Sequence, residues 1–180
     1  MIKKVALILI CFIWMGFIFY NSSNSGNVSN KRSYSILNNL KNIKNKILEN
    51  KVESKSQSSK IKIFNKSSIE TKFKKVFEIP DNRQERLNFI VRKCAHMFEY
   101  FILAILVSIL LFTFKLKGKQ AIVYIMFICL FYAVTDEFHQ QFIAGRTSLV
   151  SDSLIDFTGS LIGMFLFYLL YYKILNKHKA

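Results

Sequence analysis

Four long apolar runs constrain the fold of this 180-residue chain more than any other feature. They cover residues 5–20, 97–114, 121–135 and 157–172. A helix needs about 20 apolar residues to cross a hydrocarbon layer of ~30 Å, so each run must extend into its flanks. The runs are too long and too aromatic for surface helices of a soluble protein. The sequence therefore predicts an all-α integral membrane bundle of four transmembrane helices.

The first run has a second interpretation as a cleaved secretory signal peptide, because Lys3 and Lys4 precede it. The stretch that follows, YNSSNSG, lacks a cleavage site of the Ala-x-Ala type. We expect the run to be retained as a membrane helix, with cleavage as the alternative.

Lysine clusters predict the topology of the chain. The net charge of +15 would suggest a nucleic-acid partner in a soluble protein, but here lysines cluster at residues 3–4, 115–119 and 173–179, at alternate ends of the runs. The positive-inside rule assigns these ends to the cytoplasm. We therefore expect a multi-pass protein of the bacterial cytoplasmic membrane with both termini cytoplasmic, a long extracytoplasmic loop, and no nucleic-acid partner.

The chain divides into four segments on this interpretation. Residues 1–20 form the first transmembrane helix, residues 21–86 a basic extracytoplasmic segment, residues 87–175 a three-helix region, and residues 176–180 a cytoplasmic tail. The three cysteines show no CxxC spacing, which predicts unpaired membrane thiols rather than a disulfide framework or a zinc cluster.

The basic segment is expected to be partly helical. Its first part, NSSNSGNVSNKRS, has the composition of a flexible linker. Apolar residues then recur every three to four positions, which predicts an amphipathic helix capped by Ser33. A second such helix is expected from Ser67 to Pro80. These helices would lie on anionic lipid or anionic cell-wall polymer; the alternatives are a cover over the bundle or partial disorder.

Acidic residues outside the basic segment number five: Glu99, Asp136, Glu137, Asp152 and Asp156. Charges at membrane depth are costly, so such residues face the inside of a bundle and are either paired or functional. Each lies near the predicted outer end of a run. The three short motifs that contain them are therefore expected to meet in a polar pocket at the outer membrane face.

The motif RKCAHMFEY places Arg92, His96 and Glu99 on one helix face. His96, Glu99 and Asp136 are the candidate catalytic residues, with His96 as general base. The non-catalytic alternative is that His96 and Glu99 form a structural pair between helices. Arg92 and Lys93 would either bind an anionic group or anchor the helix at the membrane interface.

The stretch TDEFHQQFIAGRTSLVSDSLID supplies the other site residues. Gly145 is expected to adopt positive φ in a tight turn, and Arg146 to bridge carboxylates. The predicted substrate-binding residues are Arg92, Lys93, Glu137, Gln140, Arg146, Asp152 and Asp156. No metal is assigned; if a hard cation such as Mg²⁺ binds, the expected ligands are Asp136, Asp152 and Asp156.

Four further residues have simpler interpretations. Gly159 and Gly163 form a small-xxx-small pattern that permits close helix packing. Tyr100 is expected to be an interface aromatic residue. His139 is expected to face the water layer.

The motifs RKCAHMFEY, TDEFHQQFIAGRTSLVSD and DSLIDFTGSLIG resemble the RKxxHxxEY, DExxQxFxxGRxxxxxD and DxxxDxxG signatures of the VanZ-like family of small bacterial membrane proteins. Ala144 stands where a proline often precedes the Gly-Arg pair. The family pattern falls on Arg92, Lys93, His96, Glu99, Tyr100, Asp136, Glu137, Gln140, Gly145, Arg146, Asp152, Asp156 and Gly159.

The resemblance implies a protein of the bacterial cell envelope, because the family is named for a member associated with resistance to the glycopeptide teicoplanin. One hypothesis is a non-enzymatic protein that alters drug access or modifies the envelope. The alternative is an integral-membrane hydrolase or transferase, with or without a metal, that acts on a lipid-linked or phosphorylated envelope substrate. Ion-coupled transport is a third hypothesis, which four short spans disfavour. The sequence does not decide whether the protein is an enzyme, and it assigns no cofactor.

Overall fold

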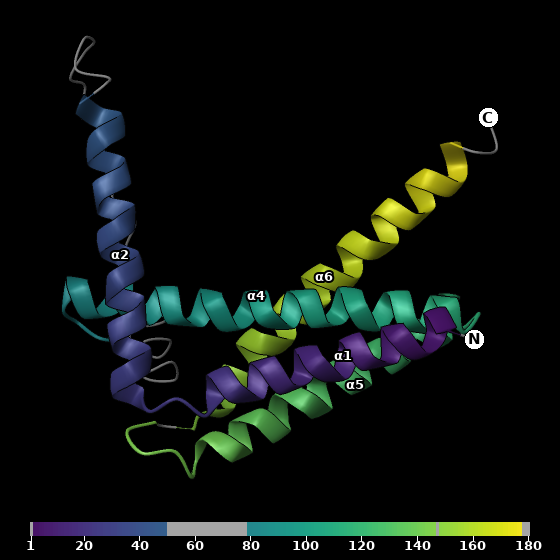
Figure 1. The fold of residues 1–180 in the computed structure, drawn as a ribbon, viewed down its shortest axis with the longest axis horizontal. Helices are drawn as coiled ribbons and strands as arrows, with labels where there is room; N and C mark the ends of the chain where they lie inside the picture. Colours follow the sequence, from purple (N-terminus) through teal and green to yellow (C-terminus); the bar gives the residue numbers. More distant parts are fainter. Residues whose placement is uncertain (1, 50–78, 147, 178–180) are drawn as a thin grey trace, which may run out of the picture. The chain divides into compact units, whose positions relative to one another are not determined.

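The computed structural model describes residues 2–49, 79–146 and 148–177. The regular elements of these residues are all helices (Figure 1). The prediction of an all-α protein is therefore confirmed for the described part of the chain. The helices are α1 (Ile2–Ser22), α2 (Gly26–Glu49), α4 (Arg83–Thr113), α5 (Gly118–Gln140) and α6 (Val150–Lys177).

Four of these helices, α1, α4, α5 and α6, are long and apolar enough to cross a membrane. The four predicted spans are thus confirmed, and each helix extends beyond its apolar run as the thickness of a bilayer requires. The chain forms two compact units, of which the first comprises Met1–Gly26 with Lys93–Ala180 and the second comprises Asn27–Arg92. Helix α4 contributes its beginning to the second unit and the rest to the first.

The first unit packs α1, α5, α6 and most of α4 around an apolar core. Ile18, Tyr100, Leu103, Ile125 and Cys129 are fully or almost fully buried there. Many large apolar side chains on the same helices point outward instead. Such a surface would drive a protein to aggregate in water, whereas hydrocarbon is its matching solvent. Burial of Tyr100 at 0% exposure corrects its assignment as an interface aromatic residue.

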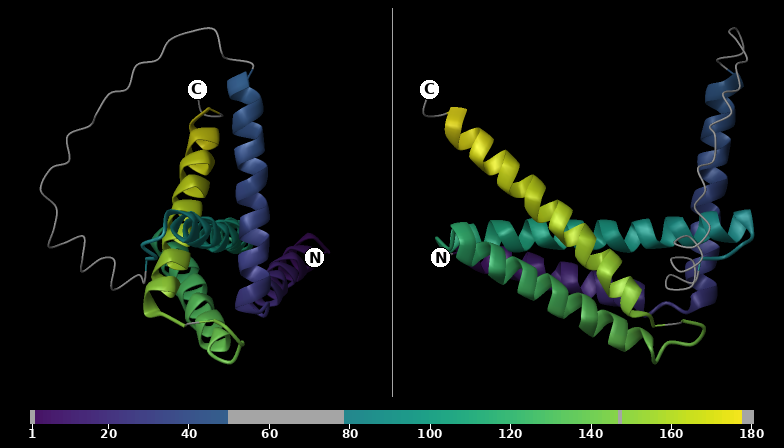
Figure 2. Two further views of the ribbon diagram at one scale, coloured as in Figure 1. Left: turned by 90° about the vertical axis from the view of Figure 1, so that its left-hand side faces the viewer. Right: turned by 180° about the vertical axis from the view of Figure 1, so that it is seen from behind.

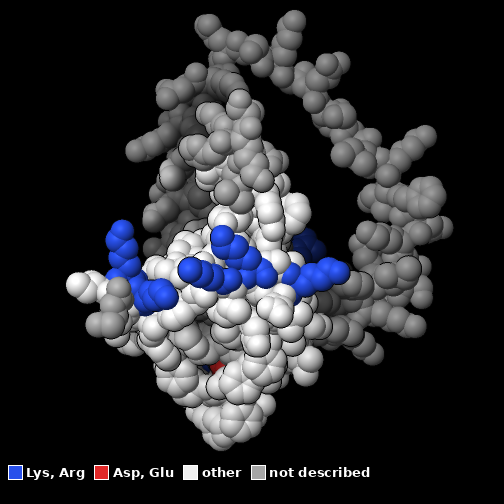
Figure 3. All heavy atoms as spheres, turned by 90° about the vertical axis from the view of Figure 1, so that its right-hand side faces the viewer, with Lys and Arg blue, Asp and Glu red and all other residues white. Residues whose placement is uncertain are grey.

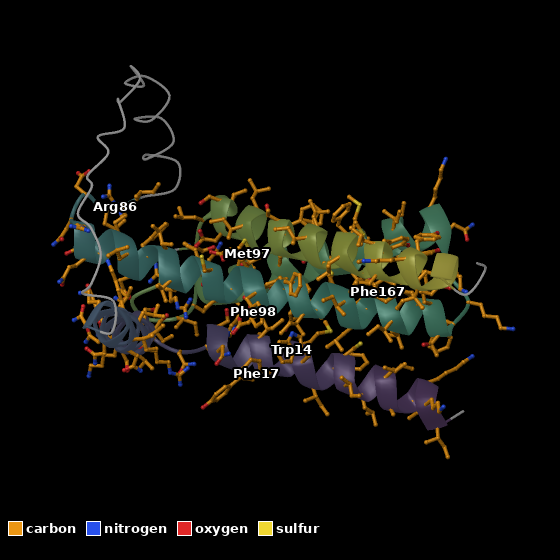
Figure 4. All side chains as sticks on the ribbon, turned by 90° about the horizontal axis from the view of Figure 1, so that it is seen from above. Trp14, Phe17, Arg86, Met97, Phe98 and Phe167 are labelled. Carbon is orange, nitrogen blue, oxygen red and sulfur yellow. The ribbon has the colours of Figure 1, made fainter. Side chains whose placement is uncertain are left out.

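Close contact between α4 and α6 depends on two glycines. Helix α6 crosses α4 obliquely, and Figure 4 shows the two helices side by side at Met97. A Cβ atom on Gly159 would collide with the backbone carbonyl of Met97, and one on Gly163 with that of Phe101. Backbone atoms cannot yield as a flexible side chain can. The small-xxx-small pattern is therefore the contact surface of α6, as expected from the sequence.

Lysines gather at one end of the first unit, where α1 begins and α4 joins α5 (Figure 3). Lys4 Nζ lies 4.7 Å from the ring centroid of Phe114, and Lys117 Nζ donates to Tyr171 Oη over 2.8 Å. Lys115 has positive φ, at 65°, in the short turn before α5. These contacts bring lysines from the start of α1 and from the α4–α5 turn to the same end of the bundle.

The second unit contains α2 and the start of α4. Asn82 Oδ1 accepts a hydrogen bond from the backbone N–H of Gln84, so Asn82 caps α4. Asn88 Nδ2 donates to Asn30 Oδ1 over 3.2 Å. Helix α2 exposes Ile36 and buries Leu37. The second amphipathic helix, expected from Ser67, lies outside the described residues.

The interpretation of residues 21–33 as a linker is wrong. Helix α1 continues through Ser22, and α2 begins at Gly26. Ser33 lies inside α2 and does not cap it; its hydroxyl donates to the carbonyl of Ser29 over 3.0 Å. Serine in a helix can satisfy its hydroxyl on the preceding turn, so serine-rich composition did not prevent helix formation here.

We predict that Gly159→Ala destabilises the first unit by about 1–3 kcal/mol, because α4 and α6 must move apart to admit the methyl group. Gly16→Ala is the matched control, since no heavy atom lies within 4 Å of a Cβ placed at Gly16. Thermal unfolding of both variants in detergent micelles measures the difference. Equal melting temperatures for the two variants would contradict the packing role of Gly159.

Candidate functional site

The five acidic residues lie at the end of the first unit opposite the lysines, near the last turn of α1, the last turn of α5 and the first turns of α6. Three of them, Asp136, Glu137 and Asp156, are only 1%, 5% and 3% exposed. Contacts between Lys93 and Asp152 and between His96 and Arg146 show that the three motifs lie together, whereas a polar pocket at the outer membrane face stays a prediction. Each acid has a different set of neighbours. These neighbours indicate which acids hold helices together and which could bind a ligand.

Asp136 is held by the last residue of α1. Ser22 Oγ donates to Asp136 Oδ2 over 2.7 Å, and Gln140 Nε2 donates to Ser22 Oγ over 2.7 Å. Gln140 Nε2 also lies 3.2 Å from Asp136 Oδ2. All three residues are buried. Only one oxygen of Asp136 is used, since no hydrogen-bond partner among the described residues reaches Oδ1.

Glu99 links α4 to α1. Asn21 Nδ2 donates to Glu99 Oε1 over 2.8 Å, and Trp14 Nε1 donates to the backbone carbonyl of Glu99 over 3.0 Å. Figure 4 shows Trp14 on the side of α1 that faces α4. The second carboxylate oxygen, Oε2, lies 3.7 Å from His96 Nδ1. Glu99 is thus in position to orient the His96 ring as well as to join two helices.

Arg146 reaches into the cluster from the α5–α6 turn. Gly145 has the predicted positive φ, at 73°, which lets the chain reverse direction before Arg146. The Arg146 guanidinium donates through Nε to the carbonyl of Asn24 over 3.2 Å and through Nη1 to Gln140 Oε1 over 3.1 Å. Its Nη1 also lies 3.5 Å from His96 Nε2. Arg146 therefore connects α1, α4 and α5 beside the acids.

Three of the predicted binding residues, Glu137, Lys93 and Asp152, make structural contacts. Glu137 Oε1 accepts from the backbone N–H of Leu149 over 2.8 Å, just before α6 begins, and Ser148 Oγ donates to the Glu137 carbonyl over 3.0 Å. Lys93 forms an ion pair with Asp152 in the first turn of α6. These contacts fix the start of α6 against α5 and α4, and removing one partner would leave a poorly solvated charge.

Arg92 is a predicted binding residue that lies outside the first unit, and its binding role stays a prediction. It belongs to the second unit, where its Nη1 lies 3.4 Å from Asn30 Oδ1. His96 and Glu99 belong to the first unit. Helical spacing alone placed the three residues on one face, but it could not show that α4 contributes to two separate packing units.

The structure brings His96, Asp136 and Asp156 closest to one another as potential ligands. One ring nitrogen of His96 and one carboxylate oxygen from each aspartate all lie within 4.8 Å of one another. This set shares Asp136 and Asp156 with the cation ligands expected from the sequence. It contains His96 where the sequence suggested Asp152, which is paired with Lys93.

Sequence reasoning missed the contribution of α1. Asn21, Ser22 and Asn24 each bond to a residue of the cluster, yet they were interpreted as part of a linker. The available signal was the run of short polar residues directly after an apolar span. His139, expected to face the water layer, is half-buried; Ser23 Oγ lies 3.1 Å from its Nε2, and its ring stacks on Phe19.

The fold and site define a multi-pass helical membrane protein whose acidic side chains gather at one end of the bundle. Residues 7–171 match the family model for VanZ/LLP1, and the chain belongs to this family. The resemblance of its three motifs to VanZ-like signatures is thereby confirmed. Comparison with curated proteins and with solved structures found no match.

We predict that Ser22→Ala lowers the unfolding free energy by about 1–3 kcal/mol, because Asp136 loses a buried donor and Gln140 a buried acceptor. Ser23→Ala is the control, since Ser23 is only half-buried and its hydroxyl bonds chiefly within its own helix. Chemical unfolding in mixed micelles measures both variants. A Ser22→Ala protein as stable as Ser23→Ala would show that the hydrogen bonds of Ser22 contribute little.

Proposed function

We propose that this VanZ-like protein acts in the bacterial cell envelope, where the polar cluster at the outer ends of its helices binds the headgroup of an envelope lipid or lipid-linked precursor. By occupying or altering that component it lowers the sensitivity of the cell to glycopeptides such as teicoplanin. The lipid bilayer is its permanent surrounding, and the proposed ligand reaches the cluster from the outer leaflet.

The observation that carries this proposal is the burial of acidic side chains inside membrane-spanning helices. Asp136, in α5, and Asp156, in α6, are almost fully buried within segments that can cross a bilayer. Holding carboxylates there costs stability, so a fold that needed only helix packing would not require them. The Arg146 guanidinium, which lies beside the acids and bonds to neutral acceptors, can hold an oxygen of an anionic headgroup.

The proposed orientation follows from charge at the two ends of the first unit. Lysines gather where α1 begins and α4 joins α5, which the positive-inside rule assigns to the cytoplasm. The acidic end, including the turn between α5 and α6, then faces outward. Both termini are cytoplasmic on this proposal, and the basic segment, residues 21–86, lies outside.

A second function, catalysis, is favoured by the surroundings of His96. Its two ring nitrogens lie 3.7 Å from a Glu99 oxygen and 3.5 Å from an Arg146 nitrogen. A histidine between a carboxylate and a guanidinium can accept a proton from water or a hydroxyl while the guanidinium holds a phosphoryl oxygen. The protein would then be a hydrolase or transferase acting on a phosphorylated envelope substrate.

We expect the turn between α5 and α6 to be accessible from outside the cell. In a chain with its three native cysteines replaced by serine, Ala144→Cys should react in intact cells with a membrane-impermeant maleimide, because Ala144 is exposed at the acidic end. Lys119→Cys, exposed at the lysine end, should react only after the cells are permeabilised. The reverse pattern would overturn the orientation.

The functional proposal is tested by drug susceptibility. In a strain that depends on this protein for teicoplanin tolerance, His96→Ala and Asp156→Asn should each restore sensitivity to the level of the empty vector. Thr158→Ala is the matched control, since Thr158 is exposed on α6 and its hydroxyl bonds to the carbonyl of Leu154 in the same helix. Membrane levels of each variant are measured by immunoblot.

Two outcomes count against the proposal. If His96→Ala and Asp156→Asn insert normally and leave tolerance unchanged, the cluster is structural and the activity lies elsewhere, for example in the basic segment. If the wild-type chain itself gives no tolerance, the association with glycopeptides does not extend to this protein.

A further inference from the structure

We propose that His96, Asp136 and Asp156 bind a divalent transition-metal ion, of the class of Zn²⁺ or Mn²⁺, at the acidic end of the first unit. This inference deepens the proposed function by naming a ligand of the same cluster, and it rests on that function only for its biological role. The metal site itself is argued from the residues alone.

The first argument is the arrangement of donor atoms. One nitrogen of His96 and one oxygen each of Asp136 and Asp156 lie within 4.8 Å of one another, although the residues come from three different helices. Ligand atoms around one zinc ion stand about 2.0–2.2 Å from the metal, so small side-chain rotations bring this set to binding distance. Three protein ligands also leave coordination positions open for a substrate oxygen or water.

The second argument is the unused oxygen of Asp136. The side chain is 1% exposed, and its Oδ2 accepts from both Ser22 and Gln140. No hydrogen-bond partner among the described residues reaches the buried Oδ1. A buried carboxylate oxygen without a donor is costly, and a bound cation would satisfy it directly. Ser22 and Gln140 would then hold the other oxygen and fix the carboxylate for coordination.

The third argument is the charge of the cluster. The five carboxylates are accompanied by two permanent cations among the described residues that contact the cluster, Lys93 and Arg146. Lys93 is paired with Asp152. Either protons or a cation must offset the remaining negative charge in surroundings of low dielectric constant. A divalent ion between Asp136 and Asp156 would do so at the place where two carboxylates approach each other.

The mixed donor set decides the class of metal. Two carboxylates alone would suit Mg²⁺ or Ca²⁺, whereas an imidazole nitrogen favours a transition ion such as Zn²⁺ or Mn²⁺. Glu99 Oε2 lies 3.7 Å from His96 Nδ1, slightly beyond hydrogen-bond distance. A small rotation of either side chain would let Oε2 accept a hydrogen bond from the Nδ1–H group, which leaves the Nε2 lone pair for the metal. Glu99 is thus a positioning residue for His96 rather than a ligand. Arg146 Nη1 lies 3.5 Å from Nε2, so the guanidinium must shift away from the ring when a metal binds, with Gln140 and the carbonyl of Asn24 as its other partners.

The experiment uses the full chain in lipid nanodiscs after removal of metals with a chelator. Zn²⁺, Mn²⁺ and Mg²⁺ are titrated separately by calorimetry, and retained metal is counted by mass spectrometry. We expect one Zn²⁺ or Mn²⁺ per chain and much weaker Mg²⁺ binding. His96→Gln and Asp156→Asn should each weaken binding by at least about 100-fold, and Glu99→Gln by about 10- to 100-fold.

Thr158→Ala is the control, because Thr158 is exposed on the same helix as Asp156 and its hydroxyl bonds to the carbonyl of Leu154. It should bind the metal as the wild type does. Fluorescence of the single tryptophan, Trp14, which bonds to the carbonyl of Glu99, checks that each variant is folded. For wild-type protein loaded with Mn²⁺, electron paramagnetic resonance should show coupling to one histidine nitrogen, a readout that needs no variant.

Three outcomes would overturn the metal site. They are absence of stoichiometric binding by the wild type, equal loss of binding in Thr158→Ala and Asp156→Asn, and a Mn²⁺ spectrum without nitrogen coupling. Failure of the metal site and failure of the proposed function are distinguishable. If the wild type binds no metal but His96→Ala abolishes drug tolerance, the proposed function stands and the metal site does not. If the wild type binds metal but does not affect tolerance, only the metal site stands.

Discussion

Buried carboxylates are the constraint on which the rest of the first unit depends. Lipid offers no water to solvate them, so neighbouring helices must supply donors and countercharges. Ser22 and Asn21 from α1, Lys93 from α4, and Gln140 from α5 each bond to one of the acids. The acids therefore tie together helices that apolar packing alone would hold only loosely, since lipid tails are as apolar as the side chains they contact.

Close backbone approach makes this arrangement possible. Gly159 and Gly163 let α6 rest against the backbone of α4, which brings Asp156 towards His96. Different residue types occupy different levels along the length of the bundle. Apolar and aromatic residues fill its middle, lysines gather at one end, and the acids gather at the other. The polar end can hold reactive side chains in a fixed arrangement, because the rest of the bundle fixes the positions of the helices.

Much of this could be predicted from the sequence, because hydrophobic length and charge act locally along the chain. The four spans, the turn at Gly145 and the packing of Gly159 all follow from short patterns. Contacts between residues far apart in the sequence could not be predicted from short patterns. That Asp152 pairs with Lys93, and that His96 lies beside Asp136 and Asp156, depends on how helices rotate against one another. Composition also misled for residues 21–33, where serine and asparagine bond back to the helix or into the cluster.

The position of Ser22 has a consequence for biogenesis. Its partners Asp136 and Gln140 lie 114 and 118 residues further along the chain. At a synthesis rate of about 5–20 residues per second, the end of α1 waits on the order of 10 s for them. Asp156 arrives later still. During insertion, α1 and α4 therefore enter the bilayer before the carboxylates of α5 and α6 are present to bond with them. The polar end of the bundle is completed only when α5 and α6 insert.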